Sequence, residues 1–215
     1  MTTSSTAQGR RRVRNRQAIL DAALALIEVS GIEGWSMREL AERVDYTPGA
    51  LYRYFDGKAA LLAALTEESM DGLRTHLAEC ESMDGEVDRL VELGLAYIDY
   101  AAARPTLFRL GLVEMPSRRT SVGQEPGSGS PYAILLRAVR SALDTDAMTA
   151  TDSFGAEEIA YTIWATVHGM AVLEQTHLRG FDADFPTIHR EALRRLLAGL
   201  ATVPPPGAAH IQSEC

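Results

Sequence analysis

The sequence predicts an all-α protein of about nine helices in two domains. Apolar residues recur three and four positions apart along much of the 215-residue chain, the period of helices that bury one face. Strand signals are absent, and Gly, Pro and capping residues separate the periodic stretches. We therefore expect an N-terminal three-helix domain with a helix-turn-helix, followed by a C-terminal helical domain.

Composition limits the class of protein further. Apolar residues make up 46% of the chain, which is enough to bury a core, and no run of about 18 apolar residues suggests a membrane span. The N-terminus lacks the apolar segment of a secretion signal, so we expect a cytoplasmic protein. Cys80 and Cys215 are far apart and have no metal-ligand spacing, so we expect no disulfide and no metal. No cofactor is expected either.

The first 12 residues predict a disordered basic arm. A leader rich in Ser and Thr precedes five arginines, at positions 10, 11, 12, 14 and 16. The first helix is expected over residues 13–30, with Gly31 as its stop. Such an arm can neutralise phosphates or enter a minor groove, and the alternative is a charge run that merely keeps the terminus soluble. Beside the motif that follows, the first interpretation is favoured.

Residues 36–55 predict two short helices joined by a tight turn. Ser36 is the expected N-cap of the first helix, whose apolar stripe at i, i+3, i+4 and i+7 consists of Met37, Leu40, Ala41 and Val44. The second helix has Thr47 as its cap, Pro48 at its first position and an inward-facing pair, Leu51 and Phe55.

This phase leaves a distinctive set of side chains outside: Gly49, Ala50, Tyr52, Arg53 and Tyr54. Exposed tyrosines beside an arginine are typical of interfaces, and the two small residues let the helix end approach a groove closely. The pattern therefore predicts a helix-turn-helix that binds DNA.

These residues carry a resemblance to a known family. Residues 16–58 resemble the DNA-binding domain of the TetR family of transcriptional regulators, in the opening Ile19-Leu20-Asp21-Ala22-Ala23, in Gly31 and Ser36-Met37-Arg38-Glu39-Leu40-Ala41, and in the ending Leu51, Tyr52, Tyr54, Phe55 and Lys58. The turn departs from the pattern, since Asp45 and Tyr46 stand where the family usually has glycine and a small apolar residue. Aspartate tolerates a left-handed backbone, so the turn can still form.

The expected partner is double-stranded operator DNA. Phosphate contacts are expected from the arm and the motif, namely from Arg12, Arg14, Arg16, Ser36, Thr47, Tyr52, Tyr54 and Lys58. Gly49, Ala50 and Arg53, with Pro48 beside them, are expected nearest to the base edges. Arg53 is the first choice for a guanine contact, with a phosphate as its alternative. The charge agrees with this division, because residues 1–58 carry nine Lys or Arg against seven Asp or Glu, and the rest carries twelve against twenty-two.

The DNA-binding domain is expected over residues 13–73 and the second domain over residues 74–203. Helices are expected over residues 56–80, 86–103, 106–114, 132–144, 156–178 and 184–200. Residues 116–131, rich in Gly, Ser and Pro, predict a mobile loop, and residues 204–215 predict a disordered tail. The family resemblance implies that the second domain dimerises through its last two long helices and holds a small effector, largely apolar, between its middle helices.

Trp164, His168 and Gly169 are similar to a tryptophan-histidine-glycine signature that names one C-terminal domain type of this family. Trp164 and His168 share one helix face, and Gly169 permits close approach of another helix. They could pack the core or the dimer seam, with the histidine bonded to a backbone carbonyl, or line an effector pocket; no second ligand at a persuasive spacing supports a metal. Candidate pocket residues are Tyr97, Tyr100, Phe108, Leu112, Met115, Tyr132, Leu136, Trp164 and His168.

The expected function is that of a homodimeric repressor that binds a palindromic operator and is released by a small-molecule effector. The alternative is an effector-independent regulator or architectural DNA binder whose second domain serves only dimerisation. An enzyme is not expected, because the chain has no Gly-x-Ser-x-Gly elbow, phosphate loop, His-Glu-x-x-His or dinucleotide fingerprint.

Overall fold

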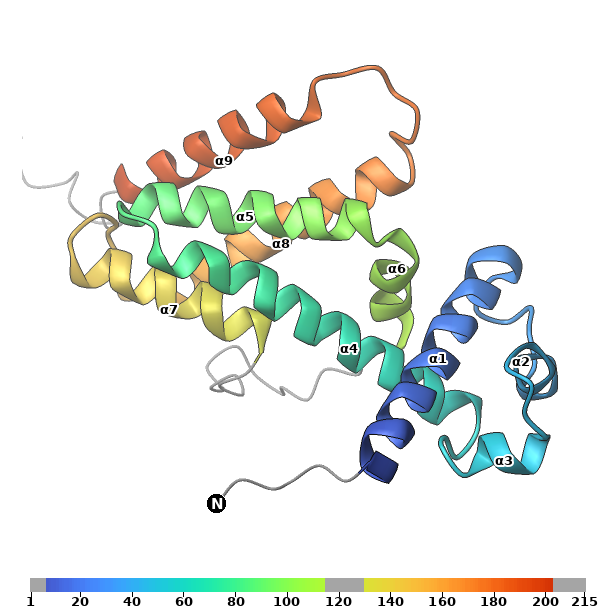
Figure 1. Cartoon of the computed structure of the whole chain (residues 1–215). Helices are drawn as coiled ribbons and strands as arrows, with labels where there is room; N and C mark the ends of the chain where they lie inside the picture. Colours follow the sequence, from blue (N-terminus) through green and yellow to red (C-terminus); the bar gives the residue numbers. More distant parts are fainter. Residues whose placement is uncertain (1–6, 115–129, 203–215) are drawn as a thin grey trace, which may run out of the picture. The chain divides into compact units, whose positions relative to one another are not determined.

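The computed structural model describes residues 7–114 and 130–202, which fold as helices joined by short connections (Figure 1). The helices are α1 (Ala7–Ser30), α2 (Met37–Arg43), α3 (Pro48–Tyr52), α4 (Lys58–Ala78), a 3-10 turn η1 (Glu79–Ser82), α5 (Glu86–Ala103), α6 (Pro105–Glu114), α7 (Pro131–Asp144), α8 (Ala156–Gln175) and α9 (Phe185–Thr202). The predicted all-α fold is confirmed, since these ranges hold nine α-helices and no β-strand. Among the helices described, none is long and apolar enough to cross a membrane.

The chain divides into two compact units. Among the described residues, the first holds residues 7–69 and 104–114, and the second holds residues 70–103 and 130–202. Helix α6 therefore belongs to the first unit, although the sequence placed it in the second domain, and the division falls after Ser69 rather than after residue 73. The physical reason is packing, because Leu110 of α6 is fully buried in the core of the first unit.

The core of the first unit consists of apolar side chains from α1 to α4 and from α6. Its fully buried members include Leu20, Leu40, Leu51, Leu61 and Leu110. Of these, Leu40 and Leu51 are inward positions that the helical period predicts for α2 and α3. Trp35, which precedes α2, is also buried in this cluster. The short helices α2 and α3 are thus held mainly by their neighbours, since isolated helices of this length are not stable.

Helix α1 begins at Ala7, so the expected disordered arm is wrong for residues 7–12. Arg10, Arg11 and Arg12 lie on the helix and are exposed. Ala, Gln and Arg are good helix formers, and they outweigh the cost of Gly9. Residues 1–6, the rest of the expected arm, lie outside the described residues.

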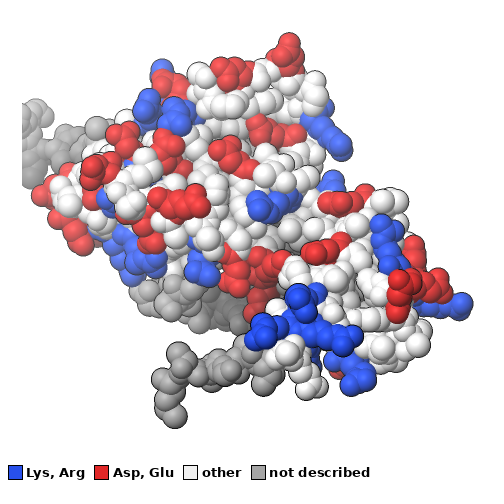
Figure 2. All heavy atoms as spheres, in the orientation of Figure 1, with Lys and Arg blue, Asp and Glu red and all other residues white. Residues whose placement is uncertain are grey.

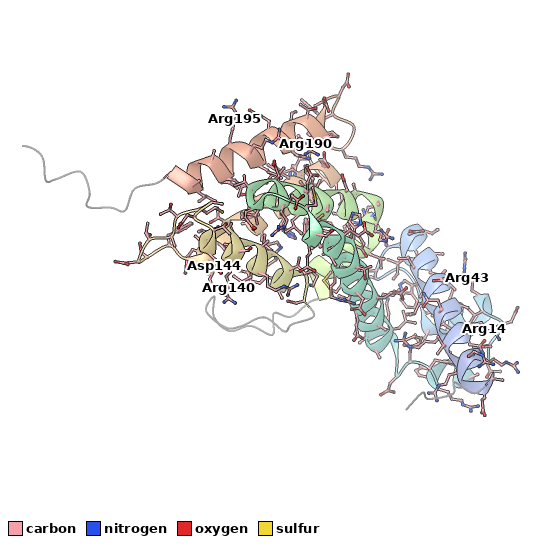
Figure 3. All side chains as sticks on the ribbon, turned by 60° about the vertical axis from the view of Figure 1, so that its left-hand side comes forward. Arg14, Arg43, Arg140, Asp144, Arg190 and Arg195 are labelled. Atoms are coloured by element: carbon pink, nitrogen blue, oxygen red, sulfur yellow. The ribbon has the colours of Figure 1, made fainter. Side chains whose placement is uncertain are left out.

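In the second unit α5 packs against α7, α8 and α9. A Cβ atom built at Gly94 would lie 2.8 Å from Leu193 Cδ1 and 3.1 Å from Val167 Cγ1, so glycine lets α8 and α9 approach α5 closely. At the edge of this packing Arg190 of α9 pairs with Glu92 of α5. Figure 3 shows Arg195, five residues farther along α9, pointing away from the bundle.

Apart from the start of α1, helix ends differ from expectation mainly around the loop and in α8. Helix α7 begins at Pro131, and the Ser130 hydroxyl accepts a hydrogen bond from Ala133 N, so the last two residues of the expected mobile loop form the start of a helix. Helix α8 ends at Gln175 rather than at residue 178. The remainder of the expected loop and the expected tail of residues 204–215, with Cys215, lie outside the described residues.

Candidate DNA-binding site

Side-chain caps define the start of both motif helices. The Ser36 hydroxyl accepts a hydrogen bond from Glu39 N at 3.2 Å, and the Thr47 hydroxyl accepts one from Ala50 N at 3.3 Å. Each hydroxyl keeps its own proton, which can be donated to a phosphate. Between the helices Asp45 adopts a φ of 55°, the left-handed conformation that the sequence allowed.

The exposed face of α3 carries most of the side chains predicted there. Tyr52 is 53% exposed, and Pro48, Gly49 and Arg53 are also exposed, whereas Ala50 is half-buried. A Cβ atom built at Gly49 would meet no atom within 4 Å, so another molecule can approach the backbone here. Leu51 points into the core as predicted.

The side chain of Tyr54 was predicted to face outward, but in the structure it is half-buried. Its ring stacks on that of Tyr46, with centroids 6.0 Å apart and planes inclined by 14°. Asn15 Nδ2 donates a hydrogen bond to the Tyr54 hydroxyl at 3.1 Å. Sequence reasoning missed Asn15 and left Tyr46 without a role. The signal for Tyr46 was its departure from the family pattern, while nothing in the local sequence marks Asn15.

Two positive side chains of the predicted site already have partners within the protein. Lys58 Nζ donates a hydrogen bond to the Trp35 carbonyl oxygen at 3.1 Å and lies 4.7 Å from the centre of the Trp35 ring. The Arg16 guanidinium lies 5.0 Å from the centre of the Phe55 ring. Both groups keep further N–H protons for an anion, but their positions are set by aromatic rings of the motif.

Positive charge is gathered at the start of α1. Figure 2 shows Lys and Arg side chains clustered over the first turns of this helix, and Arg14 projects from it in Figure 3. Arg10, Arg11, Arg12, Arg14 and Arg16 are all exposed. Since the DNA backbone carries one negative charge per phosphate, such a cluster has the charge needed for sequence-independent affinity.

The candidate effector residues separate into a cluster and a remainder. In the second unit the Tyr97 hydroxyl and His168 Nδ1 are 2.7 Å apart and hydrogen-bonded. The rings of Trp164 and His168 lie 5.9 Å apart, and Tyr132 meets Trp164 edge to face at 5.9 Å. Tyr97, Tyr132, Trp164 and His168 thus form one contiguous group from α5, α7 and α8, which we call the aromatic cluster.

Burial controls the ionisation of the aromatic cluster. It raises the pKa of Tyr97 to about 12 and lowers the pKa of His168, so both groups are held neutral near pH 7. His168 finds its partner in a tyrosine rather than in the backbone carbonyl considered from the sequence. A Cβ atom at Gly169 would meet nothing within 4 Å, so this glycine serves no close helix packing inside the described protomer.

The other candidate residues do not join this cluster. Leu136 is 1% exposed and belongs to the core, and Tyr100 is buried beside Gly72 and His76. Phe108 lies on α6 in the first unit. The side chain of Leu112 and all of Met115 lie outside the part of the chain that the structure describes.

Comparison with known proteins agrees with this architecture. Residues 19–65 match the family described as "Bacterial regulatory proteins, tetR family", and residues 90–200 match "Tetracyclin repressor-like, C-terminal domain". The chain is 52% identical over 66 residues to the HTH-type transcriptional repressor KstR of Rhodococcus jostii, covering 30% of this chain and 29% of that protein. It is 26% identical over 159 residues to the HTH-type transcriptional repressor SCO4008 of Streptomyces coelicolor, covering 73% and 78%.

A further curated relative and a solved structure also match the chain. An uncharacterized HTH-type transcriptional regulator of Bacillus subtilis, YobS, is 24% identical over half of this chain, and the aligned part spans 56% of that protein. A structure of a Rhodococcus protein of unknown function superposes with a TM-score of 0.73 at 26% identity, covering 87% of this chain and 95% of that one. Both domains and the fold therefore agree, and the chain belongs to the tetR family of bacterial regulatory proteins.

Proposed function

We propose that the protein is a homodimeric transcriptional repressor that binds a palindromic operator and is released by a small, largely apolar effector. The observation that carries the proposal is the capped α2–α3 pair with its exposed Tyr52, Arg53 and open Gly49. The names of KstR and SCO4008 as repressors support repression. Such a regulator works in the cytoplasm, where bacterial DNA lies.

DNA recognition can be tested with a charge-matched pair of variants. Arg53→Ala removes a positive charge from the exposed face of α3, whereas Arg74→Ala removes one from α4 in the second unit. We expect Arg53→Ala to weaken binding to a duplex selected by the wild-type protein from a random pool, by about 1–3 kcal/mol in a gel-shift titration at fixed salt. Equal affinities of the two variants and the wild type would contradict the role of α3.

Exposed apolar side chains on α8 and α9 support dimerisation through these helices. Tyr161, Trp164 and Leu173 of α8 and Ile188 of α9 are between 42% and 54% exposed. Cβ atoms built at Gly169 and Gly199 would meet nothing within 4 Å, so another backbone can come close there. A C₂ dimer would present two copies of α3 to successive major grooves, roughly 34–36 Å apart or a multiple of this.

The dimer is tested by Ile188→Glu, with Phe181→Glu as its control. Phe181 is 65% exposed but lies in the connection between α8 and α9, so the same charge is introduced outside the helical faces. Sedimentation is expected to show a monomer for Ile188→Glu and a dimer for Phe181→Glu. A dimer in both cases would rule out the proposed seam around Ile188.

The aromatic cluster supports an effector site. Trp164 and Tyr132 offer apolar surface, and the neutral Tyr97–His168 pair offers a few placed polar atoms, as small-molecule sites commonly do. A specific effector should raise the melting temperature by mass action, and Trp164→Ala should abolish that rise. If no compound of a broad apolar library shifts the melting temperature or the DNA affinity, the effector-independent regulator is the better description.

A further inference from the structure

Three polar side chains meet at one surface of the first unit. Asn15 comes from α1, Tyr46 from the turn between α2 and α3, and Tyr54 from the residues that follow α3. Asn15 Nδ2 donates to the Tyr54 hydroxyl at 3.1 Å, and the Tyr46 ring stacks on Tyr54. Stacking alone would be satisfied by two phenylalanines, so the Tyr54 hydroxyl calls for a separate explanation.

The hydrogen bond from Asn15 makes the Tyr54 oxygen an acceptor. This bond, with the charges of Arg12 and Arg53 adding to it, lowers the pKa of Tyr54. Among the described residues the Tyr54 hydroxyl has no hydrogen-bond acceptor, so its proton is left to a partner outside the protein.

The surroundings of this proton select an anion as the partner. Arg11 acts electrostatically on Tyr46, while Arg12 and Arg53 act on Tyr54. Accepted hydrogen bonds polarise the hydroxyl and strengthen its own donation. A hydroxyl donor among guanidinium groups is the donor set that DNA phosphates receive from proteins.

We propose that Asn15 and Tyr46 are positioning residues that hold the Tyr54 hydroxyl as a preset donor to one phosphate of the DNA backbone. Arg11 and Arg12 would supply the positive charge on the α1 side of this phosphate, and Arg53 on the α3 side. The inference rests on the proposed DNA-binding function and deepens it. It assigns a role to the unusual Tyr46 of the turn, which fixes a phosphate contact without touching DNA.

The test is a set of double-mutant cycles on the full-length protein. Affinity is measured for a duplex selected by the wild type from a random pool, at fixed salt. We expect Tyr54→Phe to weaken binding roughly tenfold, which corresponds to the loss of one charge-assisted hydrogen bond. Asn15→Ala and Tyr46→Ala should each weaken binding several-fold in the wild-type background and have no effect in the Tyr54→Phe background. Tyr46→Phe keeps the ring stack and should therefore keep wild-type affinity.

The control is Gln17→Ala, which removes an amide from the same helix whose partners are Asp21 and Glu68. It should leave affinity unchanged, and all variants should melt within a few degrees of the wild type. Losses at Asn15 or Tyr46 that persist in the Tyr54→Phe background would overturn the inference, as would an unchanged affinity of Tyr54→Phe. If Arg53→Ala still weakens binding in that case, DNA recognition by α3 stands and only the positioning role fails. If the wild type selects no duplex, the proposed function itself fails.

Discussion

The two units present different surfaces, and the difference separates two kinds of partner. The first unit exposes arginines and hydroxyl groups on short helices, with Tyr52 and Arg53 around the open Gly49. The second unit exposes large apolar side chains on long helices, such as Tyr161 and Ile188. A polar, positively charged surface binds a hydrated polyanion through its charges. An exposed apolar surface is typical of a protein–protein interface, where burial removes it from water. In the proposed function, one chain thus combines a face for DNA with a face for a second copy.

The largest effects are expected from truncation of one core leucine in each unit. Leu51 of α3 and Leu193 of α9 are both fully buried. Alanine at either position should lower the free energy of unfolding by about 2–5 kcal/mol, measured by urea denaturation. Leu51→Ala should abolish DNA binding and leave a dimer, whereas Leu193→Ala should first weaken the dimer. If both variants lost DNA binding and dimerisation to the same extent, the assignment of DNA binding to the first unit and dimerisation to the second would be wrong.

A smaller effect is expected at the glycines of the second unit. Gly94→Ala places a Cβ atom against Leu193 and Val167 and should destabilise the protein by about 1–3 kcal/mol in urea denaturation. Gly199→Ala places a Cβ atom that would meet no atom of the same chain within 4 Å, and alanine is the better helix former, so this variant should cost less than Gly94→Ala. An equal cost at both sites would contradict the close packing at Gly94.

The Ser36 cap of α2 should contribute about 1 kcal/mol to the free energy of unfolding. Ser36→Ala removes the acceptor for Glu39 N and should lower the unfolding free energy by this amount. Ser36→Asp restores a cap but adds a negative charge, so it should regain stability while binding DNA more weakly than the wild type. Thermal melts and gel shifts on both variants separate the capping role from the phosphate role. Full DNA affinity of Ser36→Asp would exclude a phosphate near this cap.

The smallest effect is a pH dependence of stability that comes from the second unit. Burial lowers the pKa of His168 below its ordinary 6.5, so the unfolded chain takes up a proton that the folded chain refuses. The contribution of His168 to stability is therefore full above pH 6.5 and declines as the pH falls below it. His168→Gln should flatten this part of the curve of unfolding free energy against pH. An unchanged slope would mean that other groups control it.

Predictability differs between local features and contacts that span many positions. Ser36, Thr47, Leu51 and the left-handed Asp45 follow from neighbours within a few positions, so the motif was predicted from local rules. The contact of Asn15 with Tyr54 spans 39 positions, and that of Tyr97 with His168 spans 71. Periodicity says which face a residue lies on but not which distant residue it meets. That is why the aromatic cluster was only partly predicted, and why the grouping of α6, with Phe108, into the first unit was not anticipated.

The start of α1 at Ala7 has a consequence for the entropy of the proposed binding to DNA. A flexible arm would lose conformational freedom when it settled on DNA, at roughly 1–2 kcal/mol for each backbone residue that becomes ordered. Arg10, Arg11 and Arg12 are already part of a helix, so most of their conformational entropy is lost on folding and not on binding. Their contribution to affinity should therefore be mostly electrostatic, with a strong dependence on salt and only a small ordering penalty.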